Sequence, residues 1–369
     1  MVLNIYKKLY NRIVFYDEIF FCFMVKTVFF RVDSSYGLGY GHINRCLILA
    51  EILQKNGFQI HFICKQLEGN LNNQIKKKGF FLHSFKNMKN SIEYDFKKTR
   101  KILTKFRNIS CLVIDSYKWY DKYENPMKKI VSKIMIIDDY GNRKHDCDIL
   151  LDQNLYYGKK HKYNSLIPKK SLRLIGPKYA LLRKEFSMSK KKSEIFKLNK
   201  IFISFGGGGE TNEVIKVLQA LNNSKIKFKK INLIIGKKDI NFKRICSIVN
   251  KLQNVKIFTT TKNISYLMEN TDLGIGAAGS MTWERAYLGI PSIVSIISKN
   301  QELVAKSMQK KGCVYNVGWT KNTTNLNYEK ILKKIQIQDL RLMSSKNKKL
   351  IDDKGASRVS KKLLSIINN

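Results

Sequence analysis

His42 follows three closely spaced glycines, a combination that could bind an anion and move a proton. Gly37, Gly39 and Gly41 stand at every second position, so the backbone there can turn tightly and approach a ligand closely. They do not follow the GxGxxG spacing of dinucleotide sites. Arg45 comes one helical turn after His42, on the same side. An imidazole beside an anion-binding turn suits general-base catalysis near neutral pH, and a histidine that only caps a tight turn is the alternative.

The residues around this turn predict a strand before it and a helix after it. Residues 28–32 are rich in β-branched and aromatic side chains, which is typical of a buried strand. His42 should lie in the first helical turn, beside free N–H groups and the positive end of the helix dipole. Gly57 can end the helix. Its apolar face follows the spacing i, i+3, i+4 and i+7, with Ile43, Cys46, Leu47 and Ala50.

Polar residues follow three further predicted strands. Strands that alternate with helices imply a parallel sheet, whose ligand crevice lies at the carboxyl ends of the strands. We therefore expect these polar side chains near the same crevice. They are Asp115, Ser116 and Tyr117 after the strand at 111–114, Asp138 and Asp139 at the end of the strand at 133–137, and Asn154 after the short strand that starts at 150.

The second half of the chain repeats the strand, glycine turn and helix. A strand at 201–205 leads into four glycines and a helix opened by Thr211 or Asn212, which predicts an anion-binding turn. A later strand at 272–275 leads into the loop GAAGSMTWE at 276–284, whose small residues let backbone donors reach phosphate oxygens. Glu284, in the same stretch, could accept two hydrogen bonds, because an ionised carboxylate only accepts. The predicted phosphate loop is Gly207, Gly208 and Gly209.

Three blocks carry a resemblance to a known family. RVDSSYGLGYGHINRCLILAEIL at 31–53 resembles the signature RxDxSxxIGxGHxxRCLxLA of the nucleotide-sugar hydrolases that release UDP during pseudaminic acid biosynthesis. GPKYALLR at 176–183 resembles their GxxYALLR, and GAAGSMTWERAYLGIPSIV at 276–294 their GAGGSTxWERxxLGxPxxV. The resemblance spans roughly residues 24–365. The last block also resembles, more loosely, the glycosyltransferase that adds N-acetylglucosamine to peptidoglycan lipid I.

The resemblance implies an α/β fold with two Rossmann-like βα domains facing a cleft, the GT-B architecture. Residues 1–23 precede the point where members of the family begin, so we expect an extension without a catalytic role. The expected organisation is an N-terminal extension (1–23), an N-terminal Rossmann-like domain with the catalytic histidine (24–186), a linker (187–200), a UDP-binding domain (201–345) and a C-terminal helix that packs back across the domains (346–369).

The resemblance also implies the reaction. In these hydrolases the histidine of the GxGH turn activates a water, which attacks C1 of a UDP-linked 2,4-diacetamido-2,4,6-trideoxy hexose with C–O cleavage and inversion. No metal and no other cofactor takes part. His42 matches that histidine, and backbone amides of the Gly208 and Ala278 loops are expected to carry the pyrophosphate. The family implies the altrose configuration, but epimeric diacetamido sugars are not distinguished by the sequence.

Candidate substrate-binding residues come from the motifs and from the strand ends. Asp33 could instead pin the glycine turn, Tyr117 could serve packing, and Arg183 could meet phosphate or tie the domains together. Ser116 stands where the family commonly has histidine, and Glu210 where it often has aspartate, which leaves the contacts at both positions uncertain. The candidates are Asp33, Gly41, Arg45, Tyr117, Asn212, Ala278, Gly279, Ser280, Glu284, Asn300 and Gln301.

The chain is strongly basic, with 69 Lys and Arg against 28 Asp and Glu and a formal net charge of +41. Such a charge suggests nucleic acid, an anionic membrane surface or acidic substrates. The lysines are scattered, however, and no aromatic-interleaved segment accompanies them. We therefore expect a solvated basic surface that favours capture of a UDP-sugar, with no specific nucleic acid and no membrane span. The sequence does not fix the oligomeric state, although a monomer is favoured. A glycosyltransferase that uses an acceptor alcohol and a nucleic-acid binder are the alternatives.

Seven widely spaced cysteines include no CxxC pair, which favours reduced thiols in a cytoplasmic protein and gives a zinc site no support. Asp146-Cys147-Asp148 has the DxD form of metal-using glycosyltransferases. A three-residue pattern is common by chance, and the surrounding order of strands and helices does not suit that fold. We therefore expect no metal site there.

Overall fold

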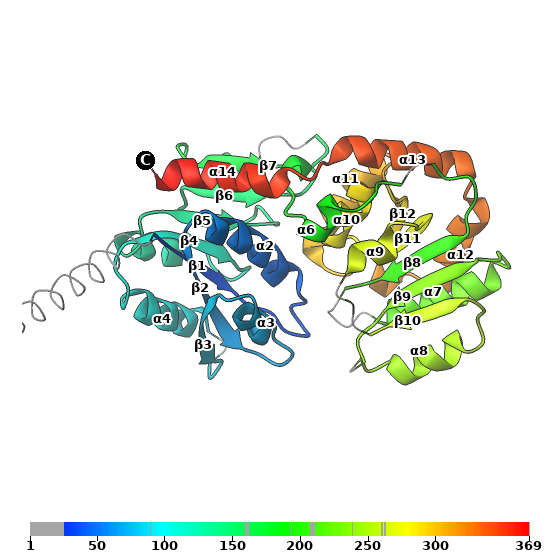
Figure 1. Ribbon diagram of the computed structural model, residues 1–369, viewed down its shortest axis with the longest axis horizontal. Helices are drawn as coiled ribbons and strands as arrows, with labels where there is room; N and C mark the ends of the chain where they lie inside the picture. The colour runs from blue at the N-terminus through cyan, green and yellow to red at the C-terminus, as the bar shows by residue number, and fades with distance from the viewer. Residues whose placement is uncertain are drawn as a thin grey trace, which may run out of the picture.

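The structure is a computed structural model that describes residues 26–89, 91–158, 162–192, 194–206, 211–237, 239–259, 261 and 263–368. The described part forms two parallel β-sheets, each with its own helices, arranged side by side (Figure 1). Thirteen described strands divide between the sheets at the segment that contains α6 (Lys184–Ser187).

The first sheet has the strand order β3-β2-β1-β4-β5-β6-β7, and every pairing between its described strands is parallel. Its strands are β1 (Thr27–Val32), β2 (Gln59–Gln66), β3 (Phe81–Lys86), β4 (Ile109–Asp115), β5 (Ile134–Ile137), β6 (Ile149–Asp152) and β7 (Leu172–Ile175). Its helices are α2 (Gly41–Lys55), α3 (Asn72–Lys77), α4 (Ile92–Leu103) and α5 (Asp121–Glu124), with the 3₁₀ turns η1 (Asn125–Lys129) and η2 (Pro177–Tyr179).

The second sheet has the order β10-β9-β8-β11-β12-β13 and is also parallel. Its strands are β8 (Lys200–Ser204), β9 (Lys230–Ile234), β10 (Val255–Phe258), β11 (Leu273–Ala277), β12 (Ser292–Ile296) and β13 (Tyr315–Trp319). The helices are α7 (Thr211–Asn223), α8 (Phe242–Val249), α9 (Ile264–Met268), α10 (Met281–Leu288), α11 (Lys299–Lys310), η3 (Thr320–Asn322), α12 (Asn325–Lys334), α13 (Ile337–Leu350) and α14 (Gly355–Ile367).

The strand order reverses at one point in each sheet, between β1 and β4 in the first and between β8 and β11 in the second. Connections leave the carboxyl ends of these two strands in opposite directions, which opens a crevice between them. The turn that contains His42 follows β1, and Asp115 ends β4. The four glycines follow β8, and the loop at residues 278–280 follows β11. The turn before His42 and the loop at residues 278–280 therefore lie at the switch points of the two sheets.

Helices cover both faces of the first sheet, and β1 shows why its sequence is apolar throughout. Val28 and Phe30 pack in one core cluster with the apolar face of α2, whereas Phe29 packs in a second cluster on the other face. A strand buried on both faces reads as a continuous apolar run rather than an alternating one. This double burial fixes β1, and with it the turn that follows.

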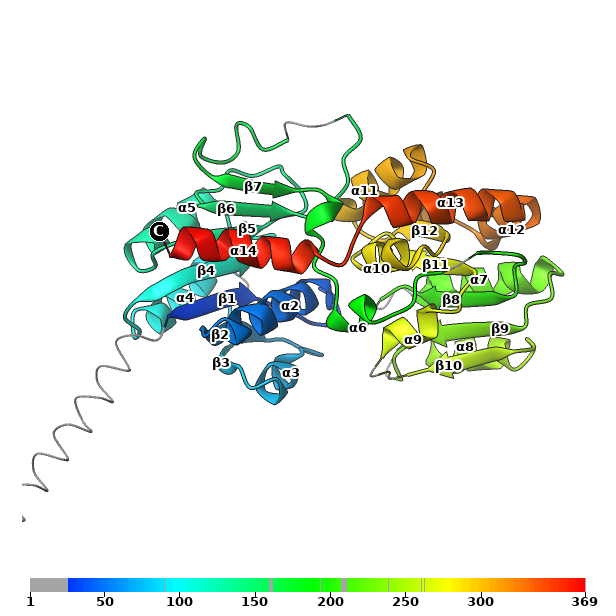
Figure 2. The ribbon, with the colours of Figure 1, turned by 45° about the horizontal axis from the view of Figure 1, so that its top comes forward.

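The end of the chain returns to the first sheet. Helix α13 lies over the second sheet and α14 over the first (Figures 1 and 2). Val359 and Leu363 of α14 belong to the same buried cluster as the apolar residues of α2. Among the described residues, no helix has the length and apolarity needed to cross a bilayer.

Candidate active site

His42 lies in the first turn of α2, behind a tight turn at the end of β1. The Gly39 N–H donates to the Ser35 carbonyl oxygen at 2.9 Å, and the Leu38 N–H donates to Ser35 Oγ at 3.0 Å. Gly39 has a φ of +72°, in the left-handed region that favours glycine. The chain therefore reverses within a few residues, and α2 starts beside the carboxyl end of β4, the neighbour of β1.

Asp115, the last residue of β4, holds the imidazole. Its Oδ1 lies 2.6 Å from Nδ1 of His42, with side-chain exposures of 1% and 14% respectively. Burial alone would raise the pKa of the Asp115 carboxyl, but the charge of Arg45, together with His42, outweighs it and holds that pKa well below its usual range. An ionised carboxylate can only accept, so this contact places the proton on Nδ1 and leaves Nε2 with the lone pair that a base needs.

Arg45, one turn along α2, is surrounded by carboxylates. Its Nε and Nη2 donate to the two oxygens of Asp115 at 2.6 Å each, and its Nη1 donates to both oxygens of Asp139 at 2.9 Å. Burial lowers the pKa of the guanidinium, but the two carboxylates raise it further, so the net shift is upward. The sequence suggested Arg45 as a substrate-binding residue; its donors instead bind the carboxylates at the ends of β4 and β5.

Tyr117 connects this cluster to the second domain. Its ring meets that of His42 edge-on, with centroids 4.6 Å apart. Its hydroxyl donates to Asp139 Oδ2 at 3.0 Å and accepts from Asn300 Nδ2, on α11, at 2.8 Å. Burial first, and then Asp139, raise the pKa of the Tyr117 hydroxyl, which therefore stays protonated. The structure thus brings together His42, Arg45, Tyr117 and Asn300, all of them candidates from the sequence.

The loop after β11 faces the first turn of α2. A Cβ added to Gly41 would lie 3.4 Å from Ser280 Oγ, so the two domains approach closely here. The Ala278 N–H donates to the Ser295 carbonyl oxygen at 3.0 Å and is therefore taken by the sheet. The N–H groups of Gly279 and Ser280 donate to no other residue in the described part of the chain. They, rather than the Ala278 amide, are the donors left for a pyrophosphate.

Two more candidates lie next to this loop. Gln301 Nε2 comes within 3.4 Å of the position that a Cβ on Gly279 would take, and Gln301 Oε1 accepts from the Ile297 N–H at 3.2 Å. Glu284, in α10, accepts from Arg183 at 2.7 and 2.8 Å. Arg183 immediately precedes α6, so this pair fixes the segment between the sheets to the second domain.

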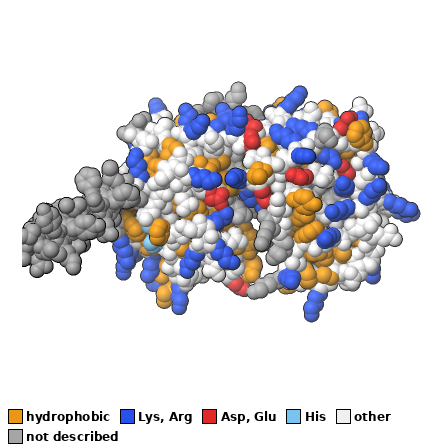
Figure 3. Space-filling model, in the orientation of Figure 1, with side chains coloured by type: hydrophobic (Ala, Val, Ile, Leu, Met, Phe, Trp, Pro, Cys, Tyr) orange, Lys and Arg blue, Asp and Glu red, His pale blue; other side chains and the backbone are white. Residues whose placement is uncertain are grey.

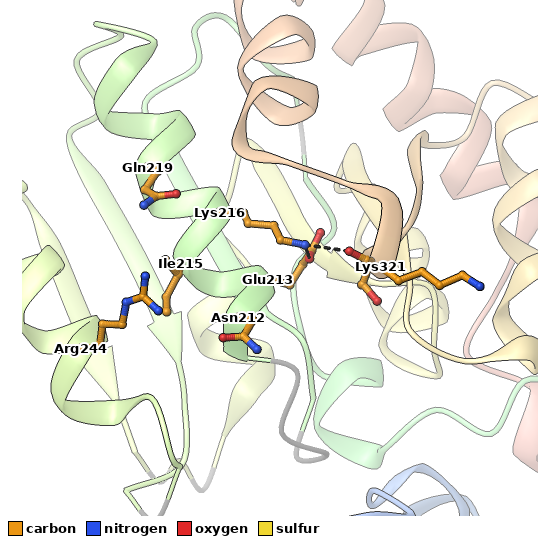
Figure 4. A pocket seen from close by; sticks show the side chains of 8 residues that line it. Asn212, Glu213, Ile215, Lys216, Gln219, Arg244 and Lys321 are labelled. Carbon is orange, nitrogen blue, oxygen red and sulfur yellow. Dashed lines mark hydrogen bonds and ion pairs between the residues drawn. The ribbon is translucent and has the colours of Figure 1, made fainter.

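Asp33 and Asn212 form hydrogen bonds with residues other than His42 and its partners. Asp33 accepts from Arg31 at 2.7 and 2.8 Å and from the Lys65 N–H at 2.7 Å, which pins the end of β1 to β2. Asn212 accepts from Asn241 at 3.1 Å. It also lines a cavity of about 520 Å³ formed by α7, α8 and η3 (Figure 4).

Lys216 crosses this cavity from α7 and donates to Glu213 at 2.8 Å and to the Thr320 carbonyl oxygen at 2.7 Å (Figure 4). The lining of the cavity includes none of the residues that surround His42. The predicted phosphate loop Gly207–Gly209, Glu210 and the extension at 1–23 lie outside the described residues.

Sequence reasoning left three residues of the cluster without a role. The sequence placed Asp115, Asp139 and Asn154 at the ends of predicted strands but assigned none of them a role in the site. Asn154 Nδ2 donates to Asp139 Oδ1 at 3.3 Å, so the ends of β4, β5 and β6 all reach one network. Their common position, a polar residue directly after a buried parallel strand, predicted that they lie near one crevice. It did not predict that they would contact Arg45 and His42.

In the Asp146-Cys147-Asp148 stretch, both aspartates bind residues of the first domain. Asp146 forms an ion pair with Lys128, and Asp148 accepts from the Ile134 N–H at 2.8 Å. Within the described ranges, no cluster of three or more His, Cys, Asp and Glu side chains could hold a metal ion. The six described cysteines are free thiols.

Comparison with solved structures gives the class of protein. MurG of Acinetobacter baumannii has a TM-score of 0.66 at 13% identity, over 92% of this chain and 99% of that one. Medicago truncatula UGT71G1, solved with UDP-glucose, has a TM-score of 0.61 at 12% identity, over 93% and 98%. Residues 201–363 match the glycosyltransferase family 28 C-terminal domain. The predicted α/β fold with two Rossmann-like domains, the GT-B architecture, is thus confirmed.

Sequence comparison gives the family. The UDP-2,4-diacetamido-2,4,6-trideoxy-beta-L-altropyranose hydrolase of Campylobacter jejuni is 32% identical over 286 residues, which cover 77% of this chain and 97% of the hydrolase. An uncharacterized protein of Methanocaldococcus jannaschii is 30% identical over 71% of this chain and 54% of its own length. The chain belongs to the family of the Campylobacter hydrolase, as the sequence motifs predicted.

Proposed function

We propose that the protein hydrolyses a UDP-linked 2,4-diacetamido-2,4,6-trideoxy hexose of altrose configuration to UDP and the free sugar, in pseudaminic acid biosynthesis. The observation that carries the proposal is the His42–Asp115 contact at the switch point of the first sheet. It leaves Nε2 of the imidazole, which makes no hydrogen bond to another described residue, on the side of the ring away from Asp115. The family relationship supplies the substrate class.

In the proposed reaction, a water oxygen attacks C1 of the sugar and the bond between C1 and the β-phosphate oxygen breaks. The electron pair of that bond leaves with UDP, and the water proton goes to Nε2 of His42. Attack from the side opposite the diphosphate inverts C1. The protein supplies orientation, a base and donors for the leaving group. No step requires a metal ion, and metal independence is part of the proposal.

The diphosphate is proposed to bind at the loop after β11. The free N–H groups of Gly279 and Ser280 and the positive end of the α10 dipole provide donors and field for two phosphates. Glu284 has lone pairs beyond the two that Arg183 occupies, and these can accept the ribose hydroxyls. Gly207–Gly209 are proposed as the second phosphate loop, on their sequence alone.

The sugar is proposed to bind between Tyr117 and the pair Asn300 and Gln301. Tyr117 and Asn300 already share a hydrogen bond across the two domains, so groups of a sugar bound there could replace it. Asp33 is a weaker candidate for a sugar contact than the sequence suggested. Arg31 donates to both of its carboxylate oxygens, and the Lys65 N–H donates to Oδ1. We further propose that the enzyme acts in the cytoplasm, which the free thiols support.

The test is UDP release by the purified protein with no acceptor present. Wild type should release UDP and free sugar in equal amounts, and His42→Gln should lower kcat by about 10²–10⁴-fold. A folded His42→Gln protein with near-normal turnover would refute the role of His42. Release that requires an added alcohol would point to a glycosyltransferase. Proton NMR over a panel of epimeric UDP-diacetamido sugars would report the preferred sugar and the configuration of the first product.

A further inference from the structure

Arg45 and Asp115 contact the same nitrogen of His42, and their demands on it conflict. Arg45 Nη2 lies 3.0 Å from Nδ1 and Asp115 Oδ1 lies 2.6 Å from it. A guanidinium only donates and a carboxylate only accepts, so Nδ1 cannot hydrogen-bond to both at once. Arg45 also binds both oxygens of Asp115. The positive charge of Arg45 therefore opposes the stabilisation that Asp115 would give to a protonated imidazole.

We infer that Arg45 is a positioning residue that lets Asp115 orient His42, with one proton on Nδ1, while it opposes the binding of a second proton at Nε2 in the resting enzyme. The inference rests on the proposed function, because only a neutral imidazole can take a proton from water. An aspartate alone beside a histidine would orient the ring and also stabilise its protonated form. The guanidinium separates these two effects.

The charges around His42 come from three elements. Helix α2 provides Arg45, and the ends of β4 and β5 provide the Asp115 and Asp139 carboxylates. Cys46 lies 3.6 Å from Asp115, and burial, followed by Asp115, raises the pKa of its thiol well above the usual value, so it is neutral. The Tyr117 hydroxyl is also neutral. Asn300, which donates to Tyr117, and Ser280, which lies near Gly41, come from the described part of the second domain and are uncharged. The balance is thus two carboxylates against one guanidinium.

Two substitutions should therefore shift the pH dependence of kcat/KM in opposite directions. Arg45→Gln removes the positive charge beside Nδ1, so the imidazole should keep its second proton to higher pH. The acidic limb of the kcat/KM profile should therefore move upward by at least about one pH unit. Asp139→Asn removes a negative charge and leaves Arg45 less neutralised, so the same limb should move to lower pH. Arg45→Lys keeps the charge and should return the limb close to its wild-type position, even where kcat is reduced.

The imidazole itself can be titrated by NMR, with the His42 signals assigned by their absence in His42→Gln. This measurement should show the same opposite shifts, and it does not depend on turnover. UDP binding and thermal unfolding report whether each variant is folded. If Arg45→Gln does not fold, Asp139→Asn and Arg45→Lys decide the question.

Shifts in the same direction for Arg45→Gln and Asp139→Asn, or no shift in either, would overturn the inference. So would a limb in Asp139→Asn that stays at the wild-type position. Normal hydrolysis by His42→Gln would instead overturn the proposed function, and the NMR titration would still test the charge balance around the ring.

Discussion

Asp115 decides which nitrogen of His42 can act as a base, and the matching variant is Asp115→Asn. The amide NH₂ of an asparagine can donate to Nδ1, which would place the ring proton on Nε2, the nitrogen proposed to accept from water. We expect kcat to fall by about 10²-fold with little change in KM, because Asp115 does not contact the loop after β11. Initial rates of UDP release over a range of substrate concentrations measure both.

The control is the same change at a second buried carboxylate–histidine pair. Glu124 Oε1 accepts from His145 Nδ1 at 2.7 Å, and both side chains are buried. Glu124→Gln should lower stability, but the turnover of each folded molecule should stay close to wild type. An Asp115→Asn enzyme as active as the Glu124→Gln enzyme would show that the contact at Nδ1 has no part in the reaction.

Glu284 allows a prediction about the ribose alone. If its carboxylate accepts the two ribose hydroxyls, Glu284→Gln should weaken UDP binding by about tenfold, because a charge-assisted hydrogen bond is replaced by a weaker neutral one. Binding of 2′,3′-dideoxy-UDP should change little, since it lacks both hydroxyls. Calorimetric titration of the two nucleotides into wild type and variant makes the comparison. Equal losses for both would mean that the substitution acts through Arg183 and the local structure.

The site residues that could be predicted from the sequence differ from the others in whether a local pattern marks them. The position of His42 at the start of a helix, and the glycine turn before it, could be predicted because their signal is local. Asp115 and Asp139 depend on which strands lie side by side, and the neighbours β1 and β4 are separated by β2, β3 and three helices in the chain. The partner of Asp33 was within reach of the sequence, because Arg31 stands two residues earlier on the same face of the strand.

At the scale of elements, the position of α14 depends on a close backbone contact. Gly355 begins this helix, and a Cβ there would lie 2.2 Å from the carbonyl oxygen of Ala180, just after η2. We expect Gly355→Ala to reduce the free energy of unfolding by about 1–3 kcal/mol, because the helix must shift away from the first domain. Urea unfolding measures the loss.

Gly236→Ala provides the comparison, since a Cβ at Gly236 meets no atom of the described residues within 4 Å and its φ is not positive. That variant should be close to wild type in stability. A Gly355→Ala protein of equal stability would mean that α14 adjusts without cost. The family resemblance predicted a helix at this end that packs back across the domains. The contact with Ala180 joins residues that are far apart in the chain and could not be predicted from either alone.

At the scale of the whole molecule, the net charge of +41 must be reconciled with a small anionic substrate. Lysine and arginine side chains are scattered over both domains in the view of Figure 3, with few acidic side chains between them. A broad positive field of this kind attracts anions from a distance and weakens as salt screens it, with a Debye length of about 10 Å at 0.1 M ionic strength. The buried contacts of Arg45 are screened far less.

The field should therefore act on the arrival of the nucleotide rather than on its retention. Between roughly 20 and 200 mM salt we expect the association rate constant for UDP to fall about 3–10-fold, while the dissociation rate constant and kcat change little. Uridine, which carries no phosphate, should bind at the same rate throughout. Stopped-flow binding separates the two constants. A loss that appeared wholly in the dissociation rate would assign the salt effect to local contacts at the loop after β11, and the scattered lysines would then have no role in capture.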